Sequence, residues 1–268
     1  MPVHSLGPGA GLYYEHTPPR DGGCTFVFFN ALTGDAGMWQ AHIVPALHEA
    51  GHGTLVYNLR GQPQSPCDPG VVLDPARIAA DAVSLLQALR PSRAVPVGLS
   101  IGGLFAIGAH LAGIPAVGLV LINTLRQDGP RLRWINDAVA RAVEVGGLPL
   151  LGDLYSPHLW SEEWLGQNRA NFLGAGGYTP LPRESAHYNM LSHANDADWD
   201  LPYERIAVPV LVLTGLRDRV FYEPEVVARL TARMPQARRL DVPNGGHLLP
   251  AERPQAVAQA LLDFAGAL

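Results

Sequence analysis

The stretch VPVGLSIGGLFAIGAHLA, residues 95–112, places one serine between glycines, after a short apolar run and before a helical pattern. Within it, Gly98-Leu99-Ser100-Ile101-Gly102 has the spacing G-x-S-x-G. Where a strand turns sharply into a helix, a serine at the apex takes a strained backbone conformation, and small residues are needed two positions before and after it. The stretch therefore predicts a strand, a tight turn and a helix that together project the Ser100 hydroxyl into a site.

Apolar runs alternate with helical patterns along most of the chain. Continuous apolar strands separated by helices are typical of a parallel sheet covered on both faces, so we expect an α/β fold. Asp74 and Pro75 mark one helix start, as N-cap and first helical residue. The sequence predicts strands at 25–29, 54–58, 93–98, 117–123, 208–215 and 237–242, an antiparallel edge strand at 12–16, and helices at 38–51, 75–90, after Ser100 to about 111, at 223–233 and at 252–266.

Residues 124–203 interrupt this alternation. They hold Trp134, Trp160, Trp164 and Trp199, and they contain helical stretches without strands between them. A long segment of this kind within a compact domain is commonly functional. We therefore expect a core made of residues 1–123 and 204–268, with residues 124–203 inserted as a helical cap over one end of the sheet.

Composition excludes several classes of function. The net charge of −5 and the lack of a basic tract argue against nucleic-acid binding, and no apolar run is long enough to span a membrane. All 19 basic residues are arginine, which excludes lysine Schiff-base chemistry. Cys24 and Cys67 give neither a disulfide framework nor a metal-binding spacing, and no signal-peptide pattern opens the sequence, so we expect a cytoplasmic protein. No motif implies a metal or dinucleotide cofactor, and none indicates an oligomeric state.

On these motifs the chain resembles the α/β-hydrolase fold family over nearly its whole length. FFNALTGDAGMW, residues 28–39, resembles a loop of the 3-oxoadipate enol-lactonase-like hydrolases, and HYNMLSHANDADW, residues 187–199, resembles the end of their cap. The resemblance implies a serine nucleophile and no cofactor.

A serine hydroxyl needs a base, and the base needs a carboxylate to orient it. In this fold the order along the chain is serine, acid, histidine. Asp218 follows the strand expected at 208–215, and His247 lies in the loop DVPNGGHLLPAERP after the last strand. Asp128 competes for the acidic role because it follows the preceding strand. The sequence predicts Ser100, Asp218 and His247 as the catalytic residues.

Two backbone N–H groups are expected to bind the oxyanion of the intermediate. One belongs to Ile101, at the start of the helix after the serine. The second comes from the loop after residues 25–29, where many relatives have His-Gly-x and this chain has Asn30-Ala31-Leu32. The resemblance assigns this role to the N–H of Leu32.

The substrate is less well specified by the sequence. Arginine binds a carboxylate bidentately, so one of the arginines at 126, 131, 133, 169 and 183 is a candidate for holding an acidic substrate. The candidate substrate-binding residues are Asn30, Arg131, Trp134, Trp160 and His187.

The reaction expected from the resemblance is hydrolysis of a small carboxylic ester or lactone through an acyl-enzyme. Asn30 to Asp35 also resembles the loop of homoserine acetyltransferases, so acyl transfer stays open. The same three residues serve carbon–carbon bond hydrolases and cofactor-free haloperoxidases, and a ligand-binding protein with weak catalysis is a further alternative.

Overall fold

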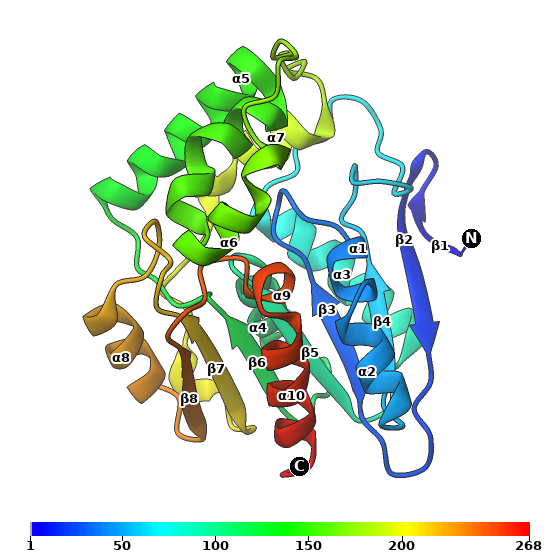
Figure 1. The fold of residues 1–268 in the computed structure, drawn as a ribbon. Helices are drawn as coiled ribbons and strands as arrows, with labels where there is room; N and C mark the ends of the chain where they lie inside the picture. Colours follow the sequence, from blue (N-terminus) through cyan, green and yellow to red (C-terminus); the bar gives the residue numbers. More distant parts are fainter. Residues whose placement is uncertain (1) are drawn as a thin grey trace.

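A computed structural model describes residues 2–268, and its strands form one eight-stranded sheet in the order β1-β2-β4-β3-β5-β6-β7-β8 (Figure 1). Strands β3 to β8 run parallel to one another, and β1 and β2 pair antiparallel at one side. The expected α/β fold is confirmed. The strands are β1 Val3–Gly7, β2 Ala10–Thr17, β3 Thr25–Phe29, β4 Gly53–Tyr57, β5 Ala94–Leu99, β6 Leu119–Ile122, β7 Val210–Gly215 and β8 Ala237–Val242.

Helices cover both faces of the sheet, as the fully buried strands β3 to β7 require (Figure 1). Ile78, Leu85 and Phe105 of α3 and α4 pack on one face, and Leu47 and Leu261 of α2 and α10 pack on the other. The helices are α1 Gly37–Gln40, α2 Ile43–Glu49, α3 Pro75–Leu89, α4 Gly102–Leu111, α5 Pro130–Leu159, α6 Glu162–Asn168, α7 Ala186–Ser192, α8 Pro224–Ala232, α9 Leu249–Glu252 and α10 Pro254–Ala265, with 3₁₀ turns at Arg169–Asn171, Ala194–Asp196 and Tyr203–Arg205.

One expected helix is divided in two, and another begins later than expected. The helix predicted at 38–51 splits into α1 and α2 because Pro45 lies in the first turn of α2, where its ring prevents the preceding turn from continuing. The helix predicted at 252–266 begins at Pro254 as α10, since the residue preceding a proline is disfavoured in the helical region and Arg253 leaves it. A separate short helix, α9, precedes it and was not predicted. By contrast, the N-cap of α3 is as predicted, with Asp74 accepting a hydrogen bond from Arg77 N at 2.7 Å.

The edge of the sheet also differs from the prediction. Residues 12–16 do lie in an antiparallel strand, β2, but β1 pairs with its outer side, so β2 is not the edge strand. The sequence VHSLG of β1 has a polar character and alternates between exposed and half-buried positions, which gives no apolar run to detect.

Residues 124–203 contribute helices α5, α6 and α7 and no strand, and Figure 1 shows these helices together at one end of the sheet. Helix α5 is interrupted at Gly147, whose φ of 69° is left-handed. A Cβ there would lie 2.3 Å from the carbonyl oxygen of Thr179, so a side chain has no room. The division into a core and a cap stays a prediction.

Within residues 2–268, none of the helices combines the length and apolar character that crossing a bilayer requires.

Candidate active site

Ser100 lies at the turn between β5 and α4 in a left-handed conformation, with φ of 57°. Such a backbone conformation is strained for a residue with a side chain and is typical of a serine at this turn. The surrounding glycines have no space for side chains. A Cβ on Gly98 would lie 2.4 Å from the backbone of Gly103, and one on Gly102 would lie 2.3 Å from the carbonyl oxygen of Phe29. The turn predicted from residues 95–112 is therefore present.

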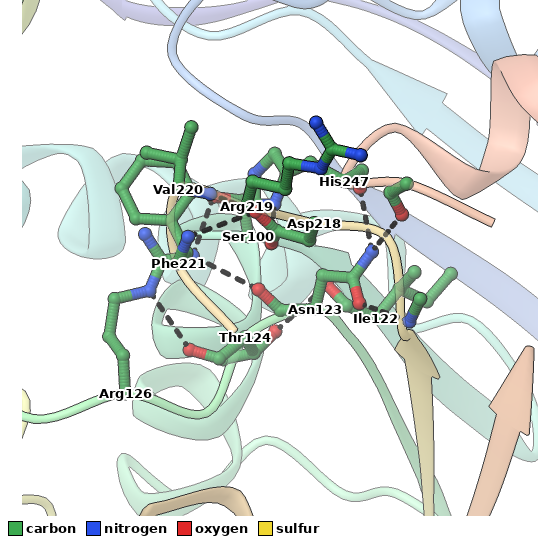
Figure 2. Close-up of polar contacts among 12 residues, drawn as sticks. Ser100, Ile122, Asn123, Thr124, Arg126, Asp218, Arg219, Val220, Phe221 and His247 are labelled. Atoms are coloured by element: carbon green, nitrogen blue, oxygen red, sulfur yellow. Dashed lines mark hydrogen bonds and ion pairs between the residues drawn. The ribbon is translucent and has the colours of Figure 1, made fainter. Parts of the chain in front are cut away.

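Asp218 and His247 are brought together by loops that follow β7 and β8. His247 Nδ1 donates to Asp218 Oδ2 at 2.6 Å, and both side chains are buried. Asp218 Oδ1 accepts hydrogen bonds from the backbone N–H groups of Val220 at 3.0 Å and Phe221 at 2.9 Å. These contacts fix the carboxylate and hold the imidazole in one orientation (Figure 2).

The pKa of Asp218 is lower than its ordinary value. Burial opposes ionisation, but the His247 ring, the Phe221 N–H and the positive charge of Arg126 favour the carboxylate more strongly. Asp218 is thus an anion at neutral pH, and its competitor Asp128 is not in the site. Asp128 is an exposed residue paired with Arg133.

The hydroxyl of Ser100 makes its side-chain hydrogen bond with an arginine. Arg126 Nη2 donates to Ser100 Oγ at 2.9 Å. Within residues 2–268, no hydrogen bond joins Ser100 Oγ to His247, although both residues line one cavity. A hydroxyl has one donor and two acceptor positions, so the bond from Arg126 leaves the Ser100 proton available to a base.

A cavity of about 130 Å³ lies above Ser100. Its wall is largely apolar, and α5 supplies much of it. The lining residues are Ala31, Leu32, Thr33, Ser100, Ile101, Arg126, Asn136, Val139, Leu151, Tyr155, Leu159, Leu191, Ala194, Trp199, Phe221, His247 and Leu248. The two expected oxyanion donors, Leu32 and Ile101, are among them, and their backbone N–H groups donate to no other group of residues 2–268.

The five candidate substrate-binding residues do not line this cavity. Asn30 is fully buried and bonds to Tyr57 O, Gln62 and Trp39 instead. Arg131 is 56% exposed and faces Glu223, and Trp134 is 79% exposed. Trp160 stacks on Trp164 with ring centroids 3.6 Å apart. His187 is half-buried on α7, and burial lowers its pKa despite the charge of Asp35. The role of these five residues as substrate contacts stays a prediction.

Asn123 and Glu252 hold the loops around His247, and sequence reasoning missed both. Asn123 Nδ2 donates to the carbonyl oxygens of Gly246 at 3.0 Å and His247 at 2.7 Å, and Oδ1 accepts from Gly215 N at 2.7 Å (Figure 2). Glu252 Oε2 accepts from the N–H groups of Gly246 at 3.0 Å and Ser161 at 3.3 Å. The available signal for Asn123 was its place at a strand end, directly after β6.

Gln62 holds the loop that contains Ala31 and Leu32. Its Nε2 donates to the carbonyl oxygens of Ala31 and Leu32 at 3.3 Å each, and its Oε1 accepts from Leu59 N at 2.8 Å.

No group of three or more His, Cys, Asp or Glu side chains in the described part of the chain is arranged so that it could hold a metal ion.

The chain belongs to the Alpha/beta hydrolase family, which residues 26–260 match. BpoC of Mycobacterium tuberculosis strain H37Rv, described provisionally as a non-heme bromoperoxidase, is 29% identical over 89% of this chain and 92% of its own length. The 3-oxoadipate enol-lactonase 1 of Acinetobacter baylyi is 26% identical over 89% and 87%. The structure of a thermophilic esterase from Thermogutta terrifontis, with malate bound, has a TM-score of 0.77 and 25% identity, covering 98% of this chain and 96% of that one. The resemblance drawn from the sequence motifs is confirmed.

Proposed function

We propose that the protein hydrolyses small carboxylic esters or lactones through an acyl-enzyme on Ser100. The observation that carries this proposal is the 2.6 Å contact between His247 and Asp218, with His247 lining the same cavity as the strained Ser100. The esterase and enol-lactonase relatives support it, because they share this fold with the same class of reaction in their names.

In the proposed reaction, His247 takes the proton of Ser100 as Ser100 Oγ attacks the acyl carbon. Asp218, ionised at neutral pH, stabilises the resulting imidazolium. The N–H groups of Leu32 and Ile101 bind the oxyanion, and His247 returns the proton to the leaving alcohol. A water molecule, deprotonated in turn by His247, then releases the acid. The hydrogen bond between a catalytic base and its nucleophile is often long without substrate and tightens when the substrate binds.

Arg126 adds a positive charge beside the nucleophile. Since Ser100 Oγ already accepts its hydrogen bond, the guanidinium favours the negative charge that develops on this oxygen as the proton leaves.

The test uses a panel of short-chain esters and lactones with wild type, Ser100→Ala and a fluorophosphonate label. We expect turnover with at least one ester, a loss of about 10³-fold or more in kcat with Ser100→Ala, and label on Ser100 by peptide mass spectrometry. Turnover that survives Ser100→Ala, or a label elsewhere, contradicts the proposal. Acetyl transfer to an added alcohol at the expense of hydrolysis would identify a transferase instead.

A further inference from the structure

Arg126 is a charged side chain buried at the wall of the cavity without an acidic partner. It is 5% exposed, and no carboxylate of residues 2–268 lies within ion-pair distance of it. The other arginine with a similarly buried side chain, Arg60, forms a bidentate pair with Asp81 at 2.5 and 2.9 Å. A buried charge is normally paired, so the isolation of Arg126 needs an explanation.

The position of the guanidinium is tightly determined. Nε donates to Thr124 O at 3.3 Å, and Nη2 donates to Asn123 O at 3.0 Å as well as to Ser100 Oγ. The rings of Phe221 and Trp199 lie 4.0 and 4.6 Å from its central carbon (Figure 2 shows the Phe221 contact). The group is therefore preorganised, which reduces the entropy lost when it binds a ligand.

One end of the guanidinium is unused. Nη1 donates no hydrogen bond to any group of residues 2–268, and the side chain lines the cavity. Asp218, the acid with the strongest attraction for Arg126, is already engaged with His247 and two backbone N–H groups. Burial lowers the pKa of Arg126 to about 10, so it keeps its charge at neutral pH. The unused donor, and a positive charge whose nearest acidic group is bonded elsewhere, both favour the binding of an anion in the cavity.

We propose that Arg126 binds a carboxylate of the substrate, and that the natural substrate is a short-chain ester or lactone carrying one. The assignment of a hydrolysed substrate rests on the proposed function, whereas binding of the carboxylate does not. Arg126 contacts Ser100 Oγ directly, so the carboxylate must lie near the scissile carbonyl. The path from Ser100 Oγ through the guanidinium to the substrate carboxylate contains two hydrogen bonds of about 2.9 Å each. This path fits roughly two or three methylene groups between the scissile carbonyl and the carboxylate.

The kinetic test compares ethyl hydrogen glutarate with ethyl pentanoate, a neutral ester of the same chain length. Wild type should have the higher kcat/KM for the acid ester. Arg126→Met should lower that kcat/KM by about 30-fold or more, as for loss of one partner of a buried charged pair, and should affect ethyl pentanoate several-fold less. Arg141→Met is the matched control, because this exposed arginine of α5 lies outside the cavity, and it should leave both substrates unchanged.

The binding test measures glutarate by isothermal titration calorimetry with Ser100→Ala, and with Ser100→Ala combined with Arg126→Met. We expect binding only where Arg126 is present. If no ester is hydrolysed but glutarate binds in this way, the hydrolase proposal fails and the carboxylate site stands.

Three outcomes would overturn the inference about the carboxylate and leave the proposed hydrolase function intact. A wild type that prefers the neutral ester, an equal loss on both esters with Arg126→Met, or glutarate binding independent of Arg126 would each do so. If Arg126→Met does not fold, as judged by circular dichroism, Arg126→Lys replaces it. That variant keeps the charge but loses the planar pair of donors, and it should still reduce the preference for the acid ester.

Discussion

The side-chain amide of Asn123, at the end of β6, donates to the main-chain oxygen of His247 at 2.7 Å. The same side chain also binds the backbone of Gly246 and Gly215, so one residue connects the end of β7, which leads to Asp218, with the loop that carries His247. Its φ of 47° is left-handed, a conformation that asparagine tolerates better than most residues. Asn123 is thus a positioning residue for two parts of the site that are distant in sequence.

Asn123→Gly should lower kcat by about 10-fold or more while leaving KM nearly unchanged. Glycine accepts the left-handed backbone, so the variant removes the side-chain hydrogen bonds without adding strain. Steady-state kinetics on the best ester from the panel measures the effect. Asn123→Asp, which keeps the acceptor for Gly215 but loses the two donated bonds, should be impaired as well, and wild-type activity in it would contradict the positioning role.

Glu252→Leu should lower both the melting temperature and the activity, because the N–H groups of Gly246 and Ser161 would lose their acceptor in a buried site. An unsatisfied buried donor costs about 1–3 kcal/mol. Glu252→Gln retains one oxygen acceptor and should lie closer to wild type on both measures. Thermal unfolding and ester turnover are the two readouts, and a glutamine variant worse than the leucine one would argue against this account.

Acid should remove a stabilising contribution of Asp218. Its folded-state pKa is depressed below the unfolded value of about 3.9, so the contribution is complete above that pH and is lost as pH falls through the folded-state pKa. Urea unfolding should show Asp218→Asn less stable than wild type at pH 7 by about 1–3 kcal/mol. The difference should shrink toward pH 3, whereas a constant difference would contradict the assigned direction.

Two glycines of α4 should respond oppositely to alanine. A Cβ on Gly103 would lie 2.0 Å from Thr124 Oγ1, so Gly103→Ala should destabilise the protein by about 1–3 kcal/mol and reduce activity. A Cβ on Gly108 meets only Ala79 at 3.9 Å, and Gly108→Ala should stabilise the helix by about 0.5–1 kcal/mol. Chemical denaturation of the two variants checks both signs in one experiment.

Sequence patterns predicted the parallel strands well, because strands buried on both faces are apolar throughout. The predictions of secondary structure failed where the apolar pattern does not mark the start or end of an element. The exposed strand β1 has no apolar run, and Pro45 divides the helix expected at 38–51. Ser100, Asp218 and His247 were predicted from a motif and from order along the chain, and the structure brings Asp218 and His247 into contact. Arg126 was one of five candidate arginines, and the sequence did not single it out. Asn123 and Glu252 were missed, because their roles depend on which strand ends meet in the folded sheet, and local sequence does not encode that.

The limits on space at the Ser100 turn fall on its neighbouring glycines, whereas residue 100 itself is limited by its left-handed backbone. Backbone atoms lie too close to Gly98 and Gly102 for a Cβ at either position, while the Ser100 hydroxyl lines the cavity beside Arg126. The glycines that shape the turn and the side chain that supplies the nucleophile can therefore be altered separately. A different nucleophile, such as a thiol or a carboxylate, can be exchanged at residue 100 with little disturbance to the scaffold, and new chemistry in this protein is best sought there and in the cavity wall.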